Sequence, residues 1–323
     1  MAVSYSTTKG LTATCMHILA GRGLISYDDR VAKFWPGFAA NGKQDITIYH
    51  VLTHQAGIPQ IPDDVTPGDI LDWNRMARVM ESLEPLWEPG AESGYHAWNF
   101  GWLCGEIIRR VDGRPIRDFL QDEVCRPLGL TQMHIGAPAA AEPKIATLVA
   151  KFDATPPMRR MWESFAGSDS LTARALSPRG EVDLNTPGAH QAQVPAVNGV
   201  MSARDLARLY ACLANYGELD GVRILSEATV RKMSARQTYR ADKVIVLPVG
   251  WALGFMTGAP GWPQGPRETA FGHAGFGGSI GFADPEIGMS FGLVLNALNL
   301  GLTGAGRAGS LAEAARACVE RKD

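Results

Sequence analysis

The sequence predicts an α+β fold in which a large helical region precedes an antiparallel sheet and a closing helix. Three observations support this prediction. Apolar residues recur at helical spacing over much of residues 1–240, strand-like segments take over after that point, and short turns with Gly or Pro join those segments. Short turns favour antiparallel pairing, because parallel neighbours need a long crossover. We therefore expect a mainly helical region at 1–240 and antiparallel strands with a C-terminal helix at 241–323.

The helical region is expected to begin almost at the first residue. Ser6 precedes apolar residues that share one helical face, and Gly21 and Gly23 end this first helix. The helices expected after it cover residues 46–52, 69–83, 100–111, 116–124 and 202–217, with a shorter one after Ser226.

Residues 136–200 differ from the rest of the helical region. Repeated prolines break the stretch, and only one short helix, near 159–165, is predicted within it before residue 200. An irregular stretch of this length in a compact protein is usually functional. It is either a lid or wall of a pocket, or a solvated excursion of the chain.

The last part of the chain supplies the sheet. Strands are predicted at 249–256, 279–283 and 289–296, and a helix at about 307–320 closes the chain.

The composition is that of a globular protein. Hydrophobic residues make up 46% and charged residues 20% of the 323 positions, which excludes an intrinsically disordered chain. This length corresponds to about two domains. The formal net charge is −2 with no long run of either sign, so nothing supports a nucleic-acid or membrane-surface partner.

The cysteines and the N-terminus indicate a reducing compartment. The five cysteines are scattered without a C-x-x-C pair, which favours neither a zinc site nor a disulfide framework. The N-terminus has no basic and apolar leader, and the most apolar stretch, 289–300, is too short to span a bilayer. We expect a cytoplasmic protein without membrane span, metal or cofactor.

A first candidate for chemistry is Ser6-Thr7-Thr8-Lys9. The S-x-x-K spacing places Ser6 and Lys9 one helical turn apart, within hydrogen-bonding reach. The positive end of the helix dipole favours the charge that develops on an attacking serine, and a desolvated lysine can act as a base near neutral pH. Alone the motif is weak, since an N-cap serine followed by a solvated lysine gives the same pattern.

A second serine motif is misleading. Gly277-Gly278-Ser279-Ile280-Gly281 matches the G-x-S-x-G elbow of α/β-hydrolases. That elbow needs an acid and a histidine downstream, but no histidine follows His273, and Ser279 opens a strand instead of ending one. We therefore reject it as a nucleophile.

Two later motifs accompany the S-x-x-K pair. Tyr95-His96-Ala97 lies on a predicted loop between helices, and His273-Ala274-Gly275 lies at the edge of the strand region. This ordered set resembles the serine β-lactamase and penicillin-binding-protein superfamily, and in particular its class C-like branch with the family VIII carboxylesterases. The stretches 51–57, 89–95 and 198–206 fit as well, so the resemblance covers nearly the whole chain.

The resemblance implies a β-lactamase/transpeptidase-like fold and an acyl-enzyme mechanism. Ser6 would be the acylated nucleophile. Lys9 would accept its proton or hold Tyr95 as a phenolate-like base. Tyr95 would pass the proton to the leaving group and later activate water, for which it needs a nearby cation or hydrogen bond from Lys9 or His273.

The strand motif would complete the oxyanion hole. The backbone N–H groups of Ser6 and Phe276 are its implied donors, and one such donor contributes about 3 kcal/mol. Gly275 has no side chain, which would let an acyl group approach the strand edge.

Two departures from the β-lactamase pattern favour an ester substrate. Ala97 stands where an asparagine usually binds the lactam side-chain amide, and His273 stands where a lysine usually attracts the substrate carboxylate. Both changes weaken recognition of an anionic amide. We therefore expect a serine hydrolase that acts as a carboxylesterase on small acyl esters. β-Lactamase or D-amino peptidase activity and a non-catalytic binding or assembly module remain the alternatives.

A third departure concerns the position of the nucleophile. In the family the nucleophile helix follows an N-terminal helix and two strands of the sheet, whereas Ser6 follows five residues. These strands are expected to be missing here, which leaves one sheet edge and a face of the 307–320 helix uncovered and predicts self-association. Either the protein starts upstream, or this is a shortened homologue with reduced activity.

Overall fold

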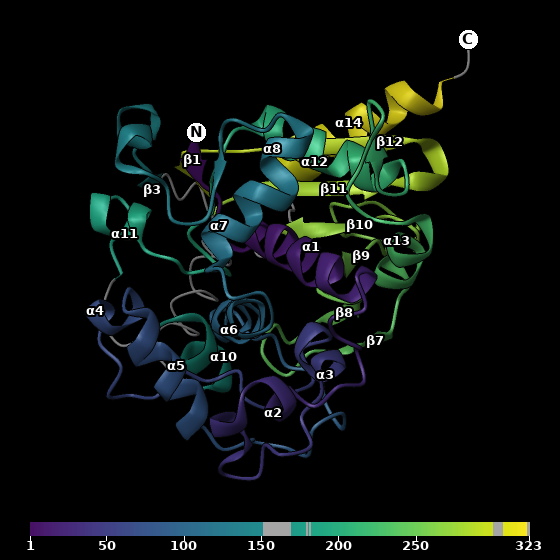
Figure 1. The fold of residues 1–323 in the computed structure, drawn as a ribbon. Helices are drawn as coiled ribbons and strands as arrows, with labels where there is room; N and C mark the ends of the chain where they lie inside the picture. The colour runs from purple at the N-terminus through teal and green to yellow at the C-terminus, as the bar shows by residue number, and fades with distance from the viewer. Residues whose placement is uncertain (151–168, 179, 181, 300–305, 322–323) are drawn as a thin grey trace.

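A six-stranded antiparallel sheet stands beside a larger body of helices in the structure, a computed structural model that describes residues 1–150, 169–178, 180, 182–299 and 306–321 (Figure 1). Its strand order is β12-β11-β10-β9-β8-β7. The bounds of these strands are β7 Thr238–Ala241, β8 Pro248–Trp251, β9 Met256–Thr257, β10 Phe271–Ala274, β11 Ile280–Asp284 and β12 Met289–Leu293. The α+β fold predicted from the sequence is therefore confirmed.

The helices lie close to their predicted positions. The described α-helices are α1 Thr8–Gly21, α2 Val31–Phe34, α3 Ile48–Leu52, α4 Pro67–Ile70, α5 Trp73–Ser82, α6 Asn99–Asp112, α7 Ile116–Leu120, α8 Arg126–Leu128, α10 Leu171–Leu176, α11 Pro187–Gln191, α12 Ala203–Ala214, α13 Glu227–Ser234 and α14 Arg307–Glu320. The helix predicted at 69–83 is two helices, because Asp72 caps a new one by accepting a hydrogen bond from the N–H of Arg75 at 3.0 Å.

Short elements connect these helices and strands. They are the 3₁₀ turns η1 Tyr5–Thr7, η2 Pro36–Ala39, η4 Ala139–Lys144 and η5 Pro285–Ile287, the π-helical turn η3 Gln121–Cys125, and the strands β1 Ala2–Val3, β2 Met133–His134, β3 Val149–Ala150, β4 Val200–Met201, β5 Glu218–Leu219, β6 Val222–Arg223 and β13 Ala297–Leu298. Strands β1, β4 and β2 form a small sheet, which holds the N-terminal residues against Val200 and Met201.

The expectation of three strands was wrong. The segment predicted as one strand at 249–256 is two strands, β8 and β9, which reverse at Gly254 with a φ of +81°. β7 and β10 were not predicted as separate strands, since four residues are too few to show an alternating pattern. β7 also crosses the division proposed at residue 240, which stays a prediction.

Helices cover both faces of the sheet. Glycines let α12 approach one face, since a Cβ at Gly292 would lie 2.6 Å from the carbonyl oxygen of Ala203. On the other face Ile280 and Phe282 form a buried cluster with Ala312 of α14. His273 pairs with Gly281, which pairs with Gly292, so the side chain of His273 lies on the α12 face. The register of the strands therefore aims His273 at the helical body.

β12 is one of the two edge strands of the large sheet. The strand pairs with β11, and no other strand in the described ranges adds to its outer edge. On the neighbouring α14, Leu311 is 50% exposed and Val319 is 47% exposed. The sequence predicted this uncovered edge and helix face.

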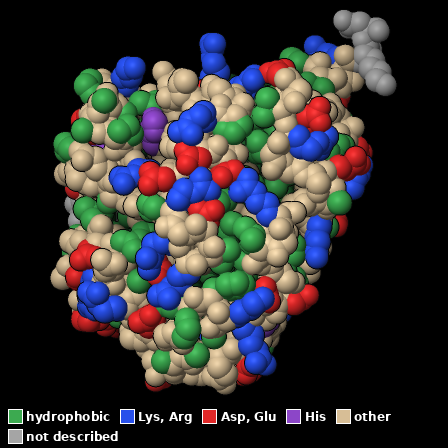
Figure 2. Space-filling view, in the orientation of Figure 1, with side chains coloured by type: hydrophobic (Ala, Val, Ile, Leu, Met, Phe, Trp, Pro, Cys, Tyr) green, Lys and Arg blue, Asp and Glu red, His purple; other side chains and the backbone are tan. Residues whose placement is uncertain are grey.

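Part of the irregular stretch at 136–200 can be described. It contains α10, α11, β3 and β4, whereas the helix predicted near 159–165 lies outside the described residues. None of the helices described is both long and apolar enough to cross a membrane. On the face seen in Figure 2, basic and acidic side chains are intermixed. Ion pairs such as that of Arg114 with Asp122 join side chains of opposite charge in the structure.

Candidate active site

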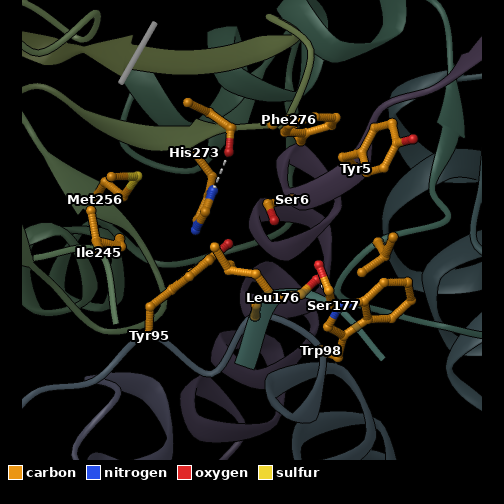
Figure 3. A pocket seen from close by; sticks show the side chains of 14 residues that line it. Tyr5, Ser6, Tyr95, Trp98, Leu176, Ser177, Ile245, Met256, His273 and Phe276 are labelled. Carbon is orange, nitrogen blue, oxygen red and sulfur yellow. Dashed lines mark hydrogen bonds between the residues drawn. The ribbon is translucent and has the colours of Figure 1, made fainter. Parts of the chain in front are cut away.

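Ser6 lies in η1, at the entrance to α1. The preceding residue, Tyr5, has a φ of +45°, a left-handed conformation that is strained for an aromatic residue. Hydrogen bonds hold this turn on both sides, because the Thr8 hydroxyl donates to the carbonyl of Tyr5 at 2.6 Å and accepts from the N–H of Gly199 at 2.9 Å. The strain therefore serves to present the Ser6 side chain to the pocket (Figure 3).

Lys9 lies one turn along α1 and is completely buried. Its Nζ lies 3.0 Å from Oγ of Ser6, 2.6 Å from the carbonyl oxygen of Ala97 and 3.1 Å from that of Ala196. Burial holds the pKa of this amine well below its usual value. A neutral amine has two N–H groups, which the two carbonyls accept, and its lone pair is then left for the Ser6 hydroxyl.

Tyr95 faces Ser6 from the loop between α5 and α6 (Figure 3). Its ring stacks on Trp251 at 5.6 Å between centroids, and Nζ of Lys9 lies 4.7 Å from its centroid. Burial raises the pKa of the Tyr95 phenol well above its usual value, and a hydrogen bond with Ser6 opposes this rise only in part. The phenol is therefore neutral at physiological pH, which suits a proton relay better than a phenolate base.

His273 is buried at the centre of the sheet face that meets the helices. Its Nδ1–H donates to the carbonyl oxygen of Ala274 at 2.7 Å, which sets the tautomer. Burial is the main cause that lowers its pKa to about 3. His273 was expected to assist Tyr95 either as a nearby cation or through a hydrogen bond. A neutral ring cannot act as the cation.

Gly275 allows the end of β10 to touch the nucleophile turn. A Cβ on this residue would lie 2.2 Å from the carbonyl oxygen of Ser4 and 2.7 Å from Oγ1 of Thr7. No larger residue fits this close approach. The contact brings Phe276 next to Ser6, and the Phe276 ring meets the Tyr5 ring edge-on at 5.3 Å. The oxyanion hole formed by the N–H groups of Ser6 and Phe276 stays a prediction.

These residues surround a pocket of about 210 Å³ (Figure 3). Among the residues that the structure describes, its lining is mostly apolar and contains no Lys, Arg, Asp or Glu. The lining residues are Tyr5, Ser6, Tyr95, Ala97, Trp98, Leu176, Ser177, Val197, Ile245, Met256, His273, Ala274, Gly275 and Phe276. All six predicted site residues except the buried Lys9 line this one pocket, and Lys9 contacts Ser6 from beneath.

Several residues that line the pocket were not identified by the sequence analysis. Leu176 and Ser177 come from the irregular stretch, whose length was the signal that it contributes to a pocket. Ile245 and Met256 come from turns and strands of the sheet region that no motif marks. Asn99, a polar residue near the tyrosine motif, is not a wall, because its amide donates to the carbonyls of Ile58 and Gln60.

The described residues offer no metal site at this pocket or elsewhere. No group of three or more His, Cys, Asp or Glu among them is close enough to hold an ion. The contacts of Ser6 with Lys9 and Tyr95 suit attack by the Ser6 hydroxyl with proton transfer through the other two side chains.

Comparisons with known proteins agree with this geometry. A family model described as Beta-lactamase matches residues 2–316. The esterase/beta-lactamase LipL of Mycobacterium tuberculosis is 39% identical over 308 residues, which cover 91% of this chain and 68% of LipL.

Solved structures are similar over almost the whole chain. A crystal structure of a family VIII carboxylesterase is 35% identical with a TM-score of 0.87, covering 98% of this chain and 83% of that chain. A penicillin-binding protein homologue from Caulobacter crescentus is also 35% identical, with a TM-score of 0.85 and the same coverage.

The buried histidines predict how stability depends on pH. Burial lowers the pKa of His17 to about 4 and those of His96 and His273 to about 3, and it holds the pKa of His54 well below its usual value. Below about pH 6.5 the unfolded chain binds protons that the folded protein does not, so stability falls as pH falls. We expect the free energy of unfolding, measured by urea denaturation, to drop between pH 7.5 and about 5, each histidine contributing at most about 1.4 kcal/mol per pH unit.

A variant that lacks one buried histidine distinguishes the contribution of the histidines to this pH dependence from that of other titratable groups. His17 lies outside the pocket lining, and His17→Gln removes one of the four groups, so the slope should become shallower. A free energy of unfolding that stays constant over this pH range in both proteins would contradict neutral burial.

Proposed function

The chain belongs to the beta-lactamase family, a family of serine hydrolases, and we propose that it is a carboxylesterase acting through an acyl-enzyme on Ser6. The motifs predicted this family. The esterase activity named for LipL and for the family VIII carboxylesterase supports the proposal.

The observation that carries the proposal is the neutrality of the pocket. None of the described residues that line it is Lys, Arg, Asp or Glu, His273 is neutral, and the amine of Lys9 is directed at Ser6 and two carbonyls instead of the pocket. A substrate carboxylate would be desolvated in the pocket without a cation from the described residues to pair with it, and desolvation of an unpaired charge costs free energy. A neutral acyl ester meets no such penalty, and the mostly apolar walls favour a small acyl group.

Acylation follows from the three polar groups. Oγ of Ser6 attacks the ester carbonyl carbon while its proton passes to the lone pair of Lys9. The N–H groups of Ser6 and Phe276 donate to the oxyanion of the tetrahedral intermediate. As the C–O bond to the alcohol breaks, Tyr95 donates its phenolic proton to the leaving oxygen and is reprotonated by Lys9.

Deacylation reverses the same transfers with water in place of the alcohol. Water attacks the acyl carbon and loses a proton through Tyr95 to Lys9, and Lys9 returns a proton to Oγ of Ser6 as the acid leaves. No net proton is left on the protein at the end of the cycle.

The competing activity is hydrolysis of β-lactams or D-amino peptides. This alternative is considered because the chain is also similar to a penicillin-binding protein homologue. The absence of an amide at Ala97 and of a cation at His273 disfavours it, because an anionic amide substrate would lose both of its polar partners here.

Ester hydrolysis by the wild type and by the variants Ser6→Ala and Ser177→Ala tests the proposal. We expect hydrolysis of p-nitrophenyl acetate and butyrate, loss of at least about 10³-fold in kcat/KM for Ser6→Ala, and little hydrolysis of a chromogenic cephalosporin. Ser177→Ala is the matched control, since Ser177 also lines the pocket but makes no contact with Lys9. Its rate should stay within about threefold of the wild type.

Three outcomes would contradict this proposal. Ester turnover that persists in Ser6→Ala would remove the nucleophile. Cephalosporin turnover faster than ester turnover would favour a β-lactamase. Failure to hydrolyse either substrate class by the folded chain would favour a binding module.

The free cysteines support the predicted cytoplasmic location. All five are free and four of them are buried. Buried thiols that form no disulfide are common in reducing compartments.

The edge of β12 and the exposed apolar residues of α14 support self-association. The outer edge of β12, which no described strand covers, and the exposed Leu311 and Val319 form a surface on which a second copy can pair. We expect the mass measured by light scattering to rise with protein concentration and Leu311→Lys with Val319→Lys to reduce that rise. Leu24→Lys is the control, because Leu24 is 46% exposed after α1. A monomer at every concentration, or equal effects of both variants, would contradict the proposal.

A further inference from the structure

The hairpin of β7 and β8 holds the loop that carries Tyr95. Asp242, directly after β7, is 1% exposed, and its Oδ1 accepts a hydrogen bond from the backbone N–H of Tyr95 at 3.0 Å. The same oxygen accepts from the N–H groups of Val244 and Ile245, each at 2.9 Å. One carboxylate oxygen therefore joins the tyrosine loop to Ile245, a wall of the pocket.

The second oxygen of Asp242 reaches the other side of Tyr95. Oδ2 accepts from the indole N–H of Trp251 at 3.3 Å, and the Trp251 ring is the surface on which the Tyr95 ring stacks, with 9° between the planes. Asp242 thus fixes both the backbone of Tyr95 and the support of its ring.

Arg240, two residues earlier on β7, forms hydrogen bonds with the same loop. Its guanidinium donates to the carbonyl of Ala91 at 2.7 Å, to the hydroxyl of Ser93 at 3.0 Å and to the side-chain oxygen of Gln55 at 2.9 Å. Arg240 therefore binds acceptors of the loop while Asp242 binds its N–H donor, so the two side chains oppose any sliding of the loop along the hairpin.

The setting of Asp242 is unusual for a carboxylate that serves stability alone. No basic side chain in the described part of the chain forms an ion pair with it, and its charge is compensated by four N–H groups. Burying a carboxylate in this way is costly, and a well-packed apolar residue would often be as stable. The contacts that it makes all converge on Tyr95 and the pocket wall.

We propose that Asp242, assisted by Arg240, is a positioning residue that sets the Tyr95 hydroxyl on Ser6. The inference rests on the proposed function, because Tyr95 must take part in the reaction. It goes further in assigning the geometry of Tyr95 to a carboxylate that does not line the pocket.

The expected effect is on the chemical step. Misplacement of a reacting group by about 1 Å costs about 10² in rate. We therefore expect Asp242→Ala to lower kcat for p-nitrophenyl butyrate about 10²-fold with a change in KM below about threefold. Asp242→Asn keeps an oxygen acceptor for the N–H of Tyr95 but presents a donor to Trp251, so its loss should be about tenfold.

Asp205→Ala is the matched control. Asp205 is also buried, at 7% exposure, and accepts a backbone hydrogen bond from Gln132, but it lies on α12 and not at the pocket. Its loss should lower the unfolding temperature while kcat stays within about twofold. A fall in kcat as large as that of Asp242→Ala would mean that lost stability explains both.

A double-mutant cycle with Tyr95→Phe decides between positioning and structure. If Asp242 acts through Tyr95, Asp242→Ala should lower kcat less than about threefold in the Tyr95→Phe background. The full loss of about 10²-fold in both backgrounds, or an unchanged kcat in Tyr95→Phe, would overturn the inference. Where Asp242→Ala does not fold, the cycle is run with Asp242→Asn, whose expected loss of about tenfold should fall below about threefold in the Tyr95→Phe background and would overturn the inference if it stayed about tenfold. Full ester turnover in Ser6→Ala would instead contradict the proposed function itself.

Discussion

Burial of the Lys9 amine is the constraint on which the site depends. An amine that reaches no water must give its N–H groups to fixed acceptors, and the carbonyls of Ala97 and Ala196 supply them. These two carbonyls belong to segments far from α1 in the sequence, so the helix, the tyrosine loop and the end of the irregular stretch must meet at one point. The same burial lowers the pKa of Lys9 and makes it a base for Ser6.

The neutrality of the neighbouring groups follows from the same burial. Desolvation is the largest cause of the lowered pKa of His54, His96 and His273, and of the lowered pKa of Lys9 itself. A core of neutral rings and a neutral amine suits a neutral ester, and the described residues of the pocket offer an anion no cationic partner. Catalytic capacity and the proposed choice of substrate therefore have one physical origin, which is a polar site kept away from water.

The sequence predicted the parts of the site that depend on local geometry. Ser6 and Lys9 share one helical turn, and the helix predicted at about 307–320 has these bounds in the structure. Contacts between distant segments were not predictable. Asp242 meets Tyr95 across 147 residues, and its strand, β7, is too short to show alternation. Ile245 and Met256 enter the pocket by tertiary packing, for which a single sequence contains no marker.

The rate at which Ser6 is acylated tests the role of Lys9 most directly. Mass spectrometry of the intact protein, quenched soon after mixing with p-nitrophenyl butyrate, follows the adduct on Ser6 as pH is varied. The adduct should form with a rate that rises with pH through a midpoint below 10.5, and Lys9→Met should slow it by about 10² or more. Lys43→Met is the control, because Lys43 is equally buried among three carbonyls but remote from Ser6. Acylation of Lys9→Met at the wild-type rate, or a midpoint at or above 10.5, would contradict a neutral Lys9 as the base.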